Sequence, residues 1–366
     1  MSWIKHVAQI EQLEHARLDP NTVQRLQSLH NRLDNATTDA GTGVTHNDIT
    51  FYIPGFKSYH IDLGVENQPV GCQQGCGRNA WPAISITGAA CQLQCDHCKA
   101  KILEPMIAAT TPMQLWRVVR ERIDNGAQGM LLTGGSNVRN EVEYKDFLPV
   151  IRKIKLQHPG FMIVCHTALV DGPAALAMED AGIDVAMMDV IGAQDTITQV
   201  YHLKRRVEDF ENTLRILSKT SMRVVPHIVL GLHYGRLLGE WRALEIIQNH
   251  PVDAVVLVVV MPYYAPAKRP FDVPASGTIG RFFAQAKTQL ANTPLFLGCA
   301  RPPGRVKTEI DIYALLAGFK GIAYPSDGIA ELARSLGRKV NISSTCCSMG
   351  TEDISLSVAA HNSVVA

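Results

Sequence analysis

The sequence predicts an α/β fold, a (β/α)8 TIM-type barrel, and three observations favour this class. Short apolar runs alternate with helix-length segments, eight of each, over residues 83–337. Runs such as Val255–Val260 are continuous rather than alternating, as expected for parallel strands that are buried on both faces. Regular βα alternation is most economically closed into a barrel.

Length and composition suit this fold and exclude several classes of partner. The chain has 366 residues, of which 46% are hydrophobic and 19% charged, so it can bury a large core. A net charge of +1 gives no reason to expect a nucleic-acid or membrane-surface partner. The first residues lack an apolar signal core, and no apolar run approaches membrane-spanning length, so we expect a cytoplasmic protein. In that reducing setting the nine cysteines are expected to be ligands or small buried residues rather than disulfides.

The predicted barrel is flanked by three further regions. The expected division is a helical extension over 1–50, a hairpin and cysteine loop over 51–82, the barrel over 83–337, and a cysteine-bearing tail over 338–366. The hairpin would pair Phe51–Ile53 with Tyr59–Asp62.

The strands and helices of the barrel follow from the apolar periodicity. The expected strands are Ala83–Thr87, Gly129–Thr133, Met162–His166, Val185–Val190, Val224–Leu230, Ala254–Met261, Leu295–Gly298 and Gly321–Tyr324. The expected helices are Pro112–Asn125, Tyr144–His158, Gly172–Ala181, Val207–Thr220, Leu237–His250, Gly277–Leu290, Lys307–Ala317 and Ser326–Leu336.

Three cysteines follow the first barrel strand at the spacing C-x3-C-x2-C, namely Cys91, Cys95 and Cys98. Thiolates are soft ligands that suit iron–sulfur clusters, and three of them leave one iron of a cubane open to a small molecule. A zinc site on Cys95 and Cys98 is the first alternative, but zinc sites typically pair two C-x2-C units and no second one occurs. A redox-active dithiol formed by Cys95 and Cys98 is the second alternative, and it leaves Cys91 without a role.

This spacing resembles the signature of the radical S-adenosylmethionine (SAM) superfamily, with His97 where the family usually has an aromatic residue. The resemblance implies a [4Fe-4S] cluster whose open iron binds the amino and carboxylate groups of SAM. Reductive cleavage of SAM would yield a 5′-deoxyadenosyl radical, with electrons from a donor of the ferredoxin or flavodoxin type.

Polar residues at the carboxyl ends of the strands are the other site candidates, because barrel active sites lie there. Thr133-Gly134-Gly135-Ser136 resembles the superfamily's Gly-Gly-Glu motif, with Ser136 in place of the acid, and is expected to approach the SAM amino group. Asp189 is a candidate for a ribose hydroxyl and Arg205 for the SAM carboxylate; alternatively, they cap a turn and lie on a solvated helix face. The substrate-pocket candidates are His227, Tyr263, Tyr264 and Arg301.

Five further cysteines lie where they could hold a second, auxiliary [4Fe-4S] cluster if the tail folds over the strand ends. They are Cys72, Cys76, Cys299, Cys346 and Cys347. We favour Cys72, Cys76 and one of the Cys346/Cys347 pair as ligands, with Cys299 as a further candidate.

The segments Leu297–Pro302 and Gly321–Ser326 are similar to the last strands of the biotin synthase-like branch of the superfamily. Of the cysteines and arginine that hold the sulfur-donating cluster in biotin synthase, the chain has at most Cys165. Cysteines before and after the barrel instead resemble the arrangement in lipoyl synthase, best the two-protein type. That resemblance implies sulfur insertion into an octanoyl chain on a lipoyl carrier protein, with the auxiliary cluster as sulfur source and a second radical SAM subunit as partner.

Two other interpretations stay open at this stage. One is a radical SAM enzyme of another kind, a methylase or a cofactor maturase resembling the hydrogenase-maturation enzymes. The other is a non-catalytic iron–sulfur accessory subunit, in which the open iron would not cleave SAM.

Overall fold

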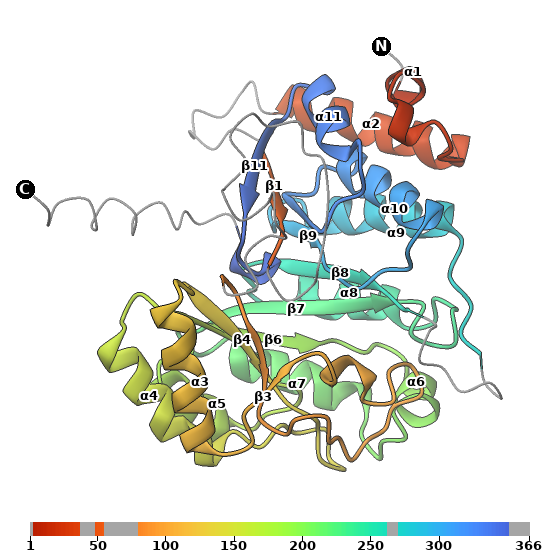
Figure 1. The fold of residues 1–366 in the computed structure, drawn as a ribbon. Helices are drawn as coiled ribbons and strands as arrows, with labels where there is room; N and C mark the ends of the chain where they lie inside the picture. Colours follow the sequence, from red (N-terminus) through yellow and green to blue (C-terminus); the bar gives the residue numbers. More distant parts are fainter. Residues whose placement is uncertain (1–2, 37–47, 55–79, 262–269, 351–366) are drawn as a thin grey trace, which may run out of the picture.

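The computed structural model describes residues 3–36, 48–54, 80–261 and 270–350, and its centre is one parallel β-sheet (Figure 1). The sheet has eleven strands in the order β11-β1-β10-β9-β8-β7-β6-β5-β4-β2-β3. The strands are β1 Asp48–Tyr52, β2 Ala83–Ser85, β3 Ile107–Ala108, β4 Gly129–Thr133, β5 Met162–His166, β6 Val185–Asp189, β7 Arg223–Leu230, β8 Val255–Val259, β9 Leu295–Leu297, β10 Gly321–Ala323 and β11 Lys339–Ser343.

The predicted α/β class is confirmed, and each of the eight expected apolar runs contains a strand. The sheet curls around an interior, and among the described strands it stays open, because β11 and β3 are its two edges and do not pair with each other. Three strands beyond the predicted eight, β1, β3 and β11, belong to it. The expected closed barrel is therefore an open, curled parallel sheet.

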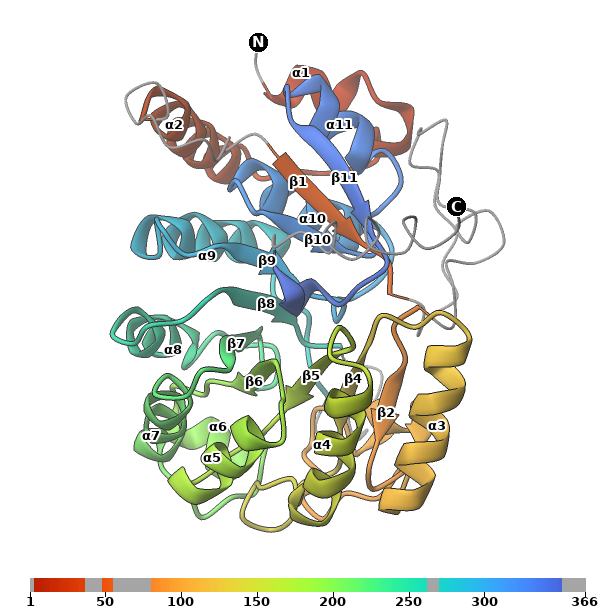
Figure 2. The ribbon, with the colours of Figure 1, turned by 90° about the vertical axis from the view of Figure 1, so that its left-hand side faces the viewer.

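Helices cover the outside of the curled sheet (Figure 2). They are α1 Trp3–Ala8, α2 Pro20–Ala36, α3 Pro112–Asp124, α4 Leu148–Gln157, α5 Gly172–Asp180, α6 Gln194–Gln199, α7 Val207–Leu217, α8 Glu240–Gln248, α9 Ser276–Gln289, α10 Arg305–Leu316 and α11 Ile329–Ser335. Local sequence sets several starts: Thr111 accepts a hydrogen bond from the Gln114 backbone N–H, and Pro112 follows it at the first helical position. Among the described helices, none combines the length and the apolar character needed to cross a membrane.

Strand β1 has a place that differs from the expected hairpin. It pairs in parallel with β10 on one side and β11 on the other, so both of its edges are taken. The expected hairpin partner, Tyr59–Asp62, lies outside the described residues. The apolar pattern of Phe51–Ile53 indicated a strand correctly, but the pairing partners lie far along the chain, where no local signal points to them.

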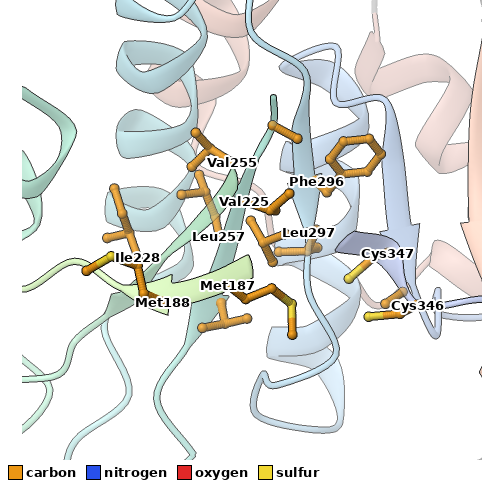
Figure 3. Packing of buried hydrophobic residues seen from close by; sticks show 14 of the residues in the cluster. Met187, Met188, Val225, Ile228, Val255, Leu257, Phe296, Leu297, Cys346 and Cys347 are labelled. Carbon is orange, nitrogen blue, oxygen red and sulfur yellow. The ribbon is translucent and has the colours of Figure 1, made fainter. Parts of the chain in front are cut away.

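The segment that follows β11 packs against the interior face of the curled sheet. After β11 the chain continues as Thr345–Gly350, whose short 3-10 helix Cys347–Met349 contacts β6, β9 and β10. The backbone oxygen of Met349 accepts from Arg223 Nη1 at 2.6 Å, and that of Gly350 accepts from the Tyr52 hydroxyl at 2.7 Å. Figure 3 shows Cys346 and Cys347 of this segment beside Phe296 and Leu297 of β9. The segment therefore crosses the interior and places its cysteines inside the sheet.

Candidate functional site

A cavity of about 320 Å3 opens inside the curled sheet, and most of its lining is apolar. It brings together the cysteine loop after β2, the glycine loop after β4, His166 and Asp189 at the ends of β5 and β6, His227 within β7, and the C-terminal segment. Carboxyl ends of parallel strands meet at one edge of a sheet, which is where α/β proteins bind ligands. The predicted site elements, separated by up to about 250 residues, therefore share one cavity.

All three cysteines of the C-x3-C-x2-C loop line this cavity. A tight turn joins the last two, because the backbone N–H of Cys98 donates to the Cys95 carbonyl at 3.2 Å. A hydrogen bond from the Cys95 thiol, with a further contribution from His97, lowers the pKa of Cys98 to about 4. The same hydrogen bond to Cys98, followed by burial, raises the pKa of Cys95. The pair thus holds one thiolate ready as a ligand before any group binds.

The donor chemistry of this loop fits an iron–sulfur cluster. Three thiols from one loop face one cavity, and thiolates are the ligands that such clusters use. Within the described residues, no three His, Cys, Asp or Glu side chains form a group that could hold a single metal ion. Cys91, Cys95 and Cys98 are the residues that would hold a cluster here.

The glycine loop is packed directly against the cysteine loop. The Gly135 backbone N–H donates to Thr87 Oγ1 at 2.7 Å, and the Ser136 carbonyl accepts from the Gln92 backbone N–H at 2.9 Å. The Cys91 thiol also donates to the Ser136 carbonyl, at 3.7 Å. All four residues of Thr133–Ser136 line the cavity. The sequence suggested glycines for close approach to a ligand, which stays a prediction. In the structure, Gly135 allows close approach of the cysteine loop, because a Cβ atom there would collide with Ala90 and Cys91.

His97, which directly precedes Cys98, lies in the cavity wall. Its ring is 5.2 Å from the ring of Tyr201, with centroids as the reference points. The Nδ1 atom is buried and has no hydrogen-bond partner among the described residues. The imidazole therefore takes an aromatic packing position and leaves one polar atom for a bound molecule to satisfy.

Asp189 and His227 both lie in the cavity, together with His166, which the sequence analysis did not select. His166 Nε2 is 3.7 Å from Asp189 Oδ1, and the rings of His166 and His227 are 6.0 Å apart. Burial alone raises the pKa of Asp189, but His166 and the other nearby imidazoles outweigh it and lower the pKa. Burial, followed by His166, lowers the pKa of His227 to about 4. Asp189 is therefore an ionised carboxylate and His227 a neutral imidazole. The sequence feature that could have identified His166 is its position at the end of a predicted strand.

Two arginines named from the sequence are engaged elsewhere and do not line the cavity. Arg205 donates to Glu141 Oε1 at 3.0 Å and to the Arg139 carbonyl at 3.2 Å. The Arg301 guanidinium, fully buried, donates to Asp311 at 2.6 Å and to the backbone carbonyls that end β9 and β10. Arg205 therefore contacts a neighbouring loop instead of lining the cavity, and Arg301 joins the ends of β9 and β10 to Asp311 of α10.

A second set of thiols, Cys299, Cys346 and Cys347, lines the same cavity. Cys346 and Cys347 are buried beside Phe296 and Leu297 of β9 (Figure 3). A hydrogen bond from Cys347 lowers the pKa of Cys346 to about 7, and the same interaction raises the pKa of Cys347, to which nearby Cys299 also contributes. The remaining candidates, Cys72, Cys76, Tyr263 and Tyr264, lie outside the described residues.

Comparisons with known proteins identify the fold. No family model matches the chain, and no curated protein matches it. Methylornithine synthase (PylB) is 11% identical with a TM-score of 0.54, and the match covers 93% of this chain and 97% of that one. A structure of HydG, a maturase of the [FeFe]-hydrogenase, is 12% identical with a TM-score of 0.57, covering 99% and 80%. HydG from Carboxydothermus hydrogenoformans is 9% identical with a TM-score of 0.52, covering 92% and 78%. The chain shares its fold with these proteins over nearly its whole length.

Proposed function

We propose that this protein is a radical SAM enzyme of the biotin synthase-like kind, in which Cys91, Cys95 and Cys98 hold a [4Fe-4S] cluster. The observation that carries the proposal is that all three thiols and the glycine loop line one cavity at the strand ends. When bound, such a cluster supplies the electron for reductive cleavage of SAM. The shared fold with methylornithine synthase and HydG is consistent with this assignment.

The chain's own residues would bind and orient SAM. The glycine loop leaves backbone groups accessible beside the cysteine loop, and the ionised Asp189 can accept hydrogen bonds from hydroxyl groups. The apolar lining excludes water from the space between them, which protects a reactive species from side reactions. The protein's share of the reaction is thus positioning and exclusion.

The finer proposal is sulfur insertion into an unactivated C–H bond of a protein-bound octanoyl chain, as in a lipoyl synthase component. It is supported by Cys299, Cys346 and Cys347, which line the same cavity as the first three thiols. These residues would hold the auxiliary cluster, which supplies sulfur in that reaction class. Cys72 and Cys76 stay candidate ligands. The mostly apolar lining suits a hydrocarbon chain.

The partners proposed for this function are an octanoylated lipoyl carrier protein, a second radical SAM subunit and an electron donor of the ferredoxin or flavodoxin type. The alternative, a methylase or cofactor maturase, has the same SAM site but gives Cys346 and Cys347 no catalytic role. Alanine at both positions would then leave turnover nearly unchanged. In a non-catalytic accessory subunit, dithionite reduction would produce no SAM cleavage.

The test is iron and sulfide content with EPR on anaerobically reconstituted protein. We expect about eight irons per chain in the wild type and about four in each of two triple alanine variants. One variant removes Cys91, Cys95 and Cys98; the other removes Cys299, Cys346 and Cys347. Only the second should cleave SAM after dithionite reduction. A first variant that cleaves SAM would overturn the radical SAM proposal, and a second variant with wild-type iron would remove the support for the auxiliary site.

A further inference from the structure

A buried carboxylate, that of Asp96, lies within the cysteine loop and does not line the cavity. Asp96 stands between Cys95 and His97, its side chain is only 5% exposed, and it is not among the residues that line the cavity. A carboxylate is expensive to bury without partners. Its position next to two of the thiols therefore calls for an account of what it binds.

Asp96 accepts from three side chains that come from three different loops. Lys99 Nζ lies 2.6 Å from Oδ1, and His202 Nε2 lies 3.0 Å from the same oxygen. The Tyr234 hydroxyl lies 2.9 Å from Oδ2. The Asp96 backbone N–H also donates to the Val200 carbonyl at 2.9 Å. The carboxylate therefore joins the cysteine loop to the loop after α6 and to the loop after β7.

The three donors share an uncommon backbone conformation. Lys99, His202 and Tyr234 have positive φ angles of 45°, 57° and 52°. Gln94 and Ala100, also in the cysteine loop, have φ angles of 48° and 59°. Residues other than glycine rarely adopt positive φ angles, because the Cβ atom then crowds the backbone. Such strain persists only where surrounding contacts stabilise it. Each of these three residues has a positive φ angle, and the side chain of each donates a hydrogen bond to Asp96.

We propose that Asp96 is a positioning residue that holds three strained loops together and thereby fixes Cys95 and Cys98 in the geometry needed to bind a cluster. This inference rests on the proposed function, in which these two cysteines are ligands. Asp96 itself does not line the cavity, so it would act through the loop that carries the thiols. Loss of its charge releases the donors, the left-handed residues relax, and the two cysteines lose their fixed spacing.

The first test measures amide hydrogen exchange in the protein without iron, so it does not depend on the cluster. Asp96→Asn should speed exchange about tenfold in three segments, residues 94–100, 199–203 and 231–236, and leave the sheet unchanged. Tyr234→Phe removes one donor and keeps the ring, which packs 4.8 Å from Phe271 between centroids, so it should speed exchange less. Glu245→Gln, at an exposed ion pair on α8, is the matched control and should change none of the three.

The second test measures iron release from the reconstituted protein to a chelator. We expect release about tenfold faster in Asp96→Asn than in the wild type, an intermediate rate in Tyr234→Phe, and the wild-type rate in Glu245→Gln. The inference is overturned if Asp96→Asn exchanges at the wild-type rate in the loops after α6 and β7. It is also overturned if exchange rises equally throughout the sheet, or if loops loosen while iron release is unchanged. Failure of the proposed function gives a different result. In that case the wild type would hold no iron that depends on Cys91, Cys95 and Cys98.

Discussion

A Cβ atom on Gly135 would lie 2.0 Å from the carbonyl oxygen of Ala90, far inside any contact distance. The same atom would lie 2.6 Å from the Cα and Cβ atoms of Cys91. The obstacle is backbone and not the end of a flexible side chain, so it cannot move aside without moving the cysteine loop. Glycine at position 135 is therefore needed for the observed position of Cys91.

We predict that Gly135→Ala displaces Cys91 and lowers the iron bound by the first site by more than half. The change is small in volume, so the far side of the sheet should keep its structure. Gly160→Ala is the matched control, because a Cβ atom there meets nothing within 4 Å. The measurement is iron content after reconstitution, with circular dichroism to check folding. Full iron content in Gly135→Ala would show that the loop can move without loss of ligands.

The ion pair between Arg301 and Asp311 is predicted to be important for stability. Both side chains are 0% exposed, and their Nε and Oδ1 atoms are 2.6 Å apart. Arg301→Met should lower the free energy of unfolding by about 3 kcal/mol, because it removes the donor to Asp311 Oδ1, while Ser326 and Lys307 still bind Oδ2 of the buried carboxylate. Arg242→Met, at the exposed pair with Glu245, should cost about 1 kcal/mol or less. Denaturant unfolding of both variants checks this, and equal costs would contradict it.

The sequence predicts those parts of this structure that depend on local pattern. Runs such as Gly129–Thr133 and Met162–His166 became strands with the expected bounds, because burial of a parallel strand on both faces leaves a continuous apolar run. The place of β1 between β10 and β11 could not be predicted in this way, since choice of pairing partner depends on contacts made across the whole chain. The engagement of Arg301 is likewise set by Asp311 on α10, and a guanidinium at a strand end looks the same in sequence whether it faces a ligand or a buried acid.

The hydrogen bonds to Asp96 predict a specific dependence of stability on pH. Burial alone would raise the pKa of Asp96, but hydrogen bonds from Lys99, His202 and Tyr234 outweigh it and lower the pKa from 3.8 to about 2. A carboxyl whose pKa is lowered by folding contributes stability that is present above its unfolded pKa and is lost as the pH falls through the folded pKa. Between about pH 4.5 and pH 2, the wild type should therefore lose about 2 kcal/mol more than Asp96→Asn.

The measurement is denaturant unfolding of the iron-free protein at several pH values in that interval. Other carboxyls with lowered pKa values, such as Asp311, contribute to both proteins and cancel in the difference. Parallel curves for wild type and Asp96→Asn would mean that the carboxylate gains nothing from its three donors.

Asp189 gives the last prediction, which concerns SAM. The carboxylate lines the cavity, and its lowered pKa keeps it ionised, so it can accept two hydrogen bonds from vicinal hydroxyls. Asp189→Asn keeps the shape but replaces one accepting oxygen by a donor, and SAM affinity should fall about tenfold or more. Iron content should not change, because no thiol is altered. Calorimetric titration of the oxidised, reconstituted protein with SAM, which does not cleave SAM in that state, measures this, with the exposed Asp180→Asn as control. Wild-type affinity in Asp189→Asn would place the ribose elsewhere in the cavity and leave the carboxylate to orient His166 alone, since His166 Nε2 lies 3.7 Å from it.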